Sequence, residues 1–159
     1  MAGIKWGRRS YLAFCVSWLC VGQALADGTW DVMQGFGWTG TWSIICSDPP
    51  SAQNPRLRFY VDSDGVARRS LDRGADSPSL NVVIESARII TATTMGARVL
   101  NADPNWGAMN GTYADIVLVK ENGRTRTLSS RGSDGVEYIK DGIVVSSGKP
   151  IPWLEQCQN

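Results

Sequence analysis

The chain has 159 residues, 43% of them hydrophobic and 19% charged, and its formal net charge is +1 at pH 7. This length suits a single domain. The balanced charge argues against a nucleic-acid partner, because domains that neutralise many phosphates are usually basic. The sequence contains no histidine, which removes the commonest general base and the commonest metal ligand. We therefore expect no enzyme, no metal site and no cofactor.

Residues 1–26 have the parts of a secretory signal peptide. Basic residues precede the apolar run 11–21, and Ala24-Leu25-Ala26 follows it as a small-x-small cleavage pattern. The run is too short to span a bilayer as a helix. The pattern predicts cleavage after Ala26, one domain over 27–159, a periplasmic or secreted location and no stable membrane anchor. The pair Arg8-Arg9 keeps the twin-arginine export route as a less favoured alternative.

Cys46 and Cys157 are the two cysteines left once the predicted signal is removed. An even pair in an exported protein predicts one disulfide. The bridge would enclose nearly the whole domain, and loop entropy gives such a closure on the order of 4–5 kcal/mol. The two ends of the domain should then lie side by side. Two buried free thiols are the alternative.

The remaining chain is a series of short β-like runs separated by Gly, Asp and Asn turns. In "RLRFYVD", Leu57, Phe59 and Val61 alternate with Arg56, Arg58 and Tyr60, the period of a strand with one dry face. The predicted strands are Thr41–Cys46, Arg56–Asp62, Val66–Leu71, Leu80–Ser86, Arg88–Thr93, Ala97–Asn101, Tyr113–Glu121, Arg124–Ser130, Val136–Lys140 and Ile143–Ser147.

Asn122-Gly123 is the strongest hairpin signal, because both central residues of a type I′ turn need a positive φ. This turn places Glu121 opposite Arg124 and Val119 opposite Arg126. Many short antiparallel strands must hide their edges, and a closed barrel does so completely. We predict an all-β, up-and-down antiparallel barrel of about 8–10 strands. A β-sandwich is the alternative.

Two longer stretches are expected to be loops. Residues 47–55 contain too many prolines for a strand interior. Residues 101–111 are rich in turn formers and carry Trp106. That tryptophan is either a lid over a cavity or a plug that seals the core, and the plug is the favoured interpretation.

Gly40-Thr41-Trp42, at the start of the first predicted strand, resembles the Gly-x-Trp of lipocalins and their calycin relatives. The resemblance implies a barrel whose mouth holds a small apolar or amphipathic ligand, with no cofactor. The resemblance also implies that Gly40 and Trp42 have a structural role and do not bind the ligand. The aromatic residues expected to line or cap the cavity are Phe36, Trp38, Tyr60 and Trp106, and the arginines that could meet a ligand carboxylate are Arg56, Arg58 and Arg126.

A second hypothesis is a periplasmic inhibitor or interaction protein of the protease or lysozyme type. Such a protein binds its partner through loops or an extended terminus, with a few aromatic or Arg anchors. The candidates are the aromatic, Gly-rich segment 27–37 and the Trp106 loop. Loss of a protein partner on deleting 27–37, with ligand binding intact, would favour this second hypothesis.

Overall fold

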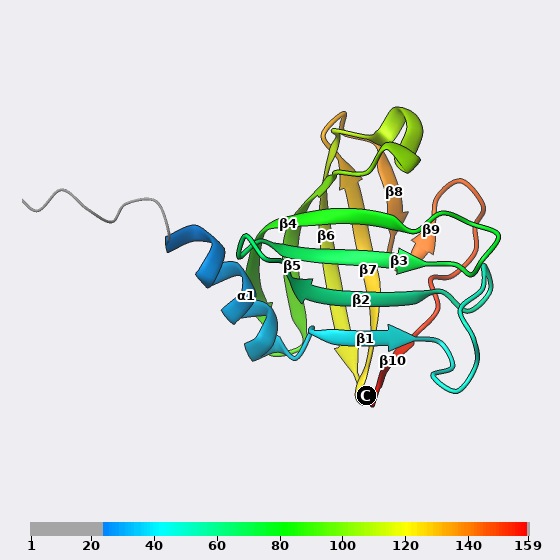
Figure 1. Ribbon diagram of the computed structural model, residues 1–159, viewed down its shortest axis with the longest axis horizontal. Helices are drawn as coiled ribbons and strands as arrows, with labels where there is room; N and C mark the ends of the chain where they lie inside the picture. The colour runs from blue at the N-terminus through cyan, green and yellow to red at the C-terminus, as the bar shows by residue number, and fades with distance from the viewer. Residues whose placement is uncertain (1–23, 159) are drawn as a thin grey trace, which may run out of the picture.

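The computed structural model describes residues 24–158. The described part is mostly β, with one α-helix and one short 3-10 helix (Figure 1). In chain order the elements are α1 (Ala24–Phe36), β1 (Gly40–Ser43), β2 (Arg56–Val61), β3 (Ala67–Asp72), β4 (Leu80–Thr91), β5 (Thr94–Asn101), η1 (Pro104–Met109), β6 (Tyr113–Glu121), β7 (Arg124–Gly132), β8 (Glu137–Lys140), β9 (Ile143–Val144) and β10 (Leu154–Cys157).

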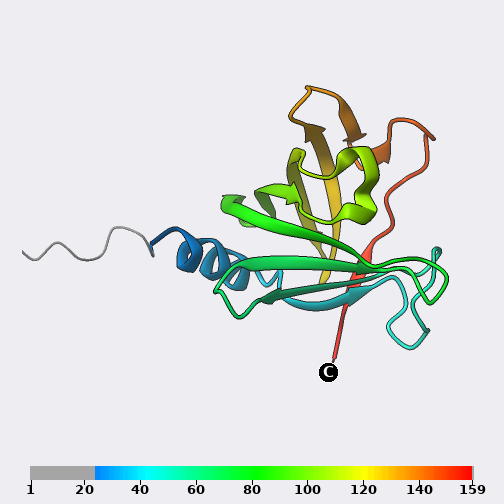
Figure 2. The ribbon, with the colours of Figure 1, turned by 45° about the horizontal axis from the view of Figure 1, so that its top comes forward.

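The strands form a closed antiparallel barrel. Each strand from β1 to β8 pairs with the next, and β10 pairs with both β1 and β7. The ring therefore consists of β1 to β7 and β10, while β8 and β9 extend from β7 as a hairpin. In Figure 2 the cyan and green strands β1 to β3 lie in one layer, which the yellow strands cross. The predicted all-β barrel is confirmed.

The disulfide between Cys46 and Cys157 fastens the barrel where it closes. The two Cα atoms lie 5.3 Å apart across a sequence separation of 111 residues. Thr41 of β1 lies opposite Cys157 of β10. The predicted bridge is confirmed, although β1 ends at Ser43 and Cys46 lies in the turn beyond it.

The predicted hairpin turns agree with the structure more closely than the predicted strand boundaries do. Asn122 and Gly123 have φ values of 49° and 75°, and Glu121 pairs with Arg124 as predicted. The predicted strands 80–86 and 88–93 are instead one strand, β4. A register shift between Ile84 and Ser86 marks a β-bulge, which lets the strand bend and continue.

The barrel interior is filled with large apolar side chains. Trp42 and Phe59 are each 2% exposed, and Val82 and Met95 are fully buried. These residues belong to a single core cluster, because alternate residues of every strand point inward. Together they form the hydrophobic core of the domain.

Helix α1 lies across one end of the barrel (Figure 1). Trp30, Met33 and Phe36 are three residues apart, which places them on one helix face. Met33 and Phe36 are buried in the barrel core, and Trp30 packs against it. The expectation of an extended arm over 27–37 was therefore wrong, because three regularly spaced apolar residues outweigh the glycines.

The predicted signal peptide falls largely outside the described residues. The structure describes the chain from Ala24, where α1 begins, and the cleavage after Ala26 stays a prediction. Within 24–158, no helix combines the length and the apolar character that a membrane span requires.

Candidate functional site

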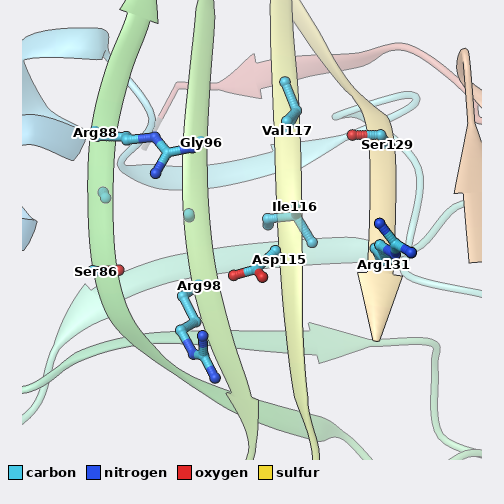
Figure 3. A pocket seen from close by; sticks show the side chains of 11 residues that line it. Ser86, Arg88, Gly96, Arg98, Asp115, Ile116, Val117, Ser129 and Arg131 are labelled. Carbon is cyan, nitrogen blue, oxygen red and sulfur yellow. The ribbon is translucent and has the colours of Figure 1, made fainter. Parts of the chain in front are cut away.

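A hollow lies on the outer face of the barrel, over strands β4 to β7. Its volume is about 550 Å³. Along β5, Met95, Ala97 and Val99 belong to the core, so Gly96 and Arg98 point outward. The side chains around it come from four adjacent strands (Figure 3). We call this hollow the outer groove; its outward-facing residues are Ser86, Arg88, Gly96, Arg98, Asp115, Val117, Ser129 and Arg131.

Cross-strand register brings the charged residues of the outer groove together. Arg98 of β5 lies opposite Asp115 of β6, and Asp115 lies opposite Arg131 of β7. Arg88 on β4 lies opposite Gly96. Directly opposite residues have Cβ atoms about 5 Å apart. Three guanidinium groups and one carboxylate thus share one surface.

Gly96 provides the space that the neighbouring side chains fill. A Cβ at this position would lie 3.3 Å from Ile90 Cδ1 and 3.5 Å from Arg88 Nε. Arg88 reaches from β4 toward Gly96 (Figure 3). The missing side chain therefore lets Arg88 lie over β5 instead of standing away from the sheet.

Two of the three arginines are held by neighbouring groups. Arg98 lies 3.7 Å from the Glu85 carboxylate, and its guanidinium lies 4.9 Å from the centre of the Tyr113 ring. Arg131 Nε donates a hydrogen bond to the Gly135 carbonyl at 3.1 Å. A second hollow, of about 350 Å³, continues from the outer groove and shares Arg98, Asp115 and Arg131 with it. These contacts orient the guanidinium groups while leaving most of their N–H donors to a ligand.

Asp115 is the only acidic residue that lines either of these two hollows. Among the side chains that the structure describes, none forms a hydrogen bond or an ion pair within 4.0 Å with its carboxylate. Its oxygens are exposed and can accept hydrogen bonds from a ligand.

The predicted aromatic residues do not gather around one cavity. Phe36 and Trp38 are buried, and the Trp38 ring centre lies 3.9 Å from that of Phe59. Tyr60 is half-buried and lies under the Arg58 guanidinium at 5.5 Å. These positions match ordinary core and surface packing.

Trp106, in η1, is anchored rather than free. Its indole N–H donates to the Asn81 carbonyl at 2.9 Å, and the side chain packs against the core. Asp103 caps η1 by accepting from the Asn105 N–H, and it also accepts from Asn81. These hydrogen bonds lower the pKa of Asp103. The contacts favour the plug over the lid.

Gly40 and Trp42 occupy the positions that the sequence predicts for them. Gly40 has a φ of +77°, a conformation that favours glycine. Trp42 is buried, and its Nε1 donates to the Thr39 carbonyl at 3.0 Å. Both residues serve the packing of β1.

None of the three predicted arginines lines the outer groove; Arg56 and Arg58 lie on one face of β2, and Arg126 lies on β7. Arg56 donates to the Asp48 carbonyl at 2.9 Å and so holds the loop after β1. Arg58 is exposed beside Tyr60. Arg126 lies over the Trp153 ring, 4.6 Å from its centre.

Arg69 is the inward-facing arginine that sequence reasoning missed. It lies opposite Phe59 on one side and Val82 on the other, both of which belong to the core. Its Nε is buried without a hydrogen-bond partner among the described residues. Burial lowers the pKa of Arg69 to about 10. The Asp64-Gly65 turn fixes the register of β2 against β3. The position of this turn in the sequence could therefore have predicted that Arg69 lies opposite Phe59.

The described residues contain no group of three or more potential metal-ligating side chains. A scan against protein-family models found no match, and searches of curated proteins and of solved structures found none either.

Proposed function

We propose that this protein is an exported, non-enzymatic binding protein whose outer groove binds an anionic ligand. The observation that carries the proposal is the presence of Arg88, Arg98 and Arg131 around one hollow of about 550 Å³. The planar guanidinium fork matches carboxylate and phosphate groups through paired hydrogen bonds. The groove volume lies within the range of small-molecule sites.

The scaffold favours binding because the groove is built on strands rather than on loops. Its residues come from four hydrogen-bonded strands of a closed barrel. Side chains on such elements lose little freedom when a ligand binds, so less of the interaction energy is spent on ordering them. The disulfide supports export, since such bridges persist in oxidising compartments.

Binding to surfaces that display carboxylate, sulfate or no charge tests this proposal. We expect the wild-type protein to bind a charged surface, more weakly as salt rises. The triple variant Arg88→Gln, Arg98→Gln, Arg131→Gln should lose this binding. Arg124→Gln, an exposed arginine outside the groove, is the matched control. Equal binding by the triple variant and the wild type would refute the groove as the site.

A second proposal retains a lipocalin-like ligand inside the barrel, and Arg69 is the observation that favours it. The Arg69 Nε, which is buried without a hydrogen-bond partner among the described residues, would gain most from the carboxylate of an amphipathic ligand. Native mass spectrometry of protein from its own host tests this directly. The interior proposal requires an extra mass that denaturation removes and that Arg69→Met abolishes.

A further inference from the structure

The position of Asp115 limits the kinds of ligand that the outer groove can bind. Its carboxylate lies between Arg98 and Arg131 in the cross-strand register. A ligand that meets both guanidinium groups must therefore pass over this carboxylate. A densely charged anion would be repelled there, because like charges at close range interact unfavourably.

The same carboxylate can accept hydrogen bonds from a ligand that carries hydroxyl groups. Ionised Asp is an acceptor only, whereas the surrounding arginines are donors only. Ser86 lies opposite Arg98, and Ser129 lies opposite Val117, so each contributes a hydroxyl to the groove. A hydroxyl both donates and accepts. The lining therefore suits a ligand with one acidic group and several hydroxyls.

The length of the groove favours a ligand made of more than one such hydroxyl-bearing unit. From β4 to β7 the groove crosses three strand spacings, roughly 14 Å at about 4.8 Å each. The second hollow, reached past Arg98 and Arg131, extends this path. A linear chain of linked units fits this shape better than a compact ion.

On these grounds we infer that the outer groove binds an acidic sugar segment, a glycan whose units carry carboxylates beside hydroxyls. This inference rests on the proposed function. Arg98 and Arg131 would bind the sugar carboxylates, and Asp115 would accept from the sugar hydroxyls. Neutral sugars would lack the first interaction, and inorganic polyanions would lack the second.

Titration calorimetry at constant ionic strength with three probes tests the inference. The probes are trigalacturonate, which has carboxylates and hydroxyls, maltotriose, which has hydroxyls only, and tripolyphosphate, which is an anion without hydroxyls. We expect trigalacturonate to bind at least about tenfold more tightly than either of the others, because it alone makes both kinds of charged hydrogen bond.

Single variants test the role of the Asp115 carboxylate separately from the role of the arginines. Asp115→Asn should weaken trigalacturonate binding about tenfold while strengthening tripolyphosphate binding, because it removes both an acceptor and a repulsive charge. Arg98→Gln should weaken the binding of both anions. Arg124→Gln should change neither.

The outcomes distinguish the sugar inference from the proposed function. If tripolyphosphate binds as tightly as trigalacturonate, and Arg98→Gln weakens both, the anion groove stands and the sugar inference fails. If neither anion binds, or if Arg98→Gln binds both as the wild type does, both proposals fail.

Discussion

The two faces of β5 and β6 differ sharply although their residues alternate along the same strands. Inward, Met95 and Leu118 are at most 3% exposed and fill the barrel. Outward, Arg98 and Asp115 are exposed and face the outer groove. The inner face therefore forms the packed core, while the charges of the outer face are exposed. Substitutions on the inner face should therefore change stability, and substitutions of the charged residues in the outer groove should change ligand binding.

The largest expected effect comes from removing the bridge that fastens the barrel. The double variant Cys46→Ala, Cys157→Ala should lose about 4–5 kcal/mol of unfolding free energy, because the unfolded chain regains the entropy of a very long loop. Urea unfolding measures this loss. An unchanged midpoint and slope would contradict this entropic contribution of the bridge.

The next largest effect compares one inward and one outward side chain. Trp42→Ala should lose about 3–5 kcal/mol, because it leaves a cavity in a filled core. Val117→Ala, on the outer face of β6, should lose less than about 1 kcal/mol. Urea unfolding of both variants checks the prediction. Similar losses would contradict the assignment of the two faces.

Arg69 breaks the pattern, because it places a charge on the inner face. Its folded pKa of about 10 lies below the ordinary value for arginine, so folding disfavours its protonated form. This cost is fully present below pH 10 and fades as pH rises from about 10 toward the pKa of the unfolded chain. Arg69→Met should therefore raise the unfolding free energy at neutral pH by about 1–3 kcal/mol.

Arg58→Met, on the outer face of the neighbouring strand, is the control for Arg69→Met. We expect it to change the unfolding free energy by less than about 0.5 kcal/mol. Chemical unfolding at pH 7 compares the two variants. A loss of stability in Arg69→Met would mean that the guanidinium has a favourable partner in the folded protein.

The smallest expected effect is on the floor of the outer groove. Gly96→Ala should change stability by less than about 1 kcal/mol, since the atoms it meets are ends of flexible side chains. It should leave trigalacturonate binding nearly unchanged, because the added Cβ lies 3.5 Å from Arg88 Nε, an ordinary contact, and only Ile90 Cδ1 must give way. Gly35→Ala on α1, where an added Cβ meets nothing within 4 Å, is the calorimetric control. A large loss of binding by Gly96→Ala would contradict this prediction.

Local patterns in the sequence predicted most of the barrel. Alternation identified β2, and Asn122-Gly123 gave the correct register of β6 against β7. The cysteine pair predicted that the two ends of the domain meet, as they do where the barrel closes. Helix α1 was missed because its glycines obscured the spacing of Met33 and Phe36.

The outer groove could not be predicted in the same way, because four strands must align to form it. Bulges in β4, after Ile84, and in β7, at Leu128, change which residues face outward beyond them. Without those bulges, simple alternation places Ser129 and Arg131 on the wrong face. Arg126 illustrates the limit: its partner Val119 was predicted correctly, but its contact with Trp153 depends on the end of the chain.

The Nε–Hε signals of individual arginines in an NMR titration with trigalacturonate test the central claim most directly. We expect the signals of Arg98 and Arg131 to shift in proportion to bound ligand while that of Arg69 stays unchanged. A shift of Arg69 with Arg98 and Arg131 unchanged would contradict it and place the ligand inside the barrel.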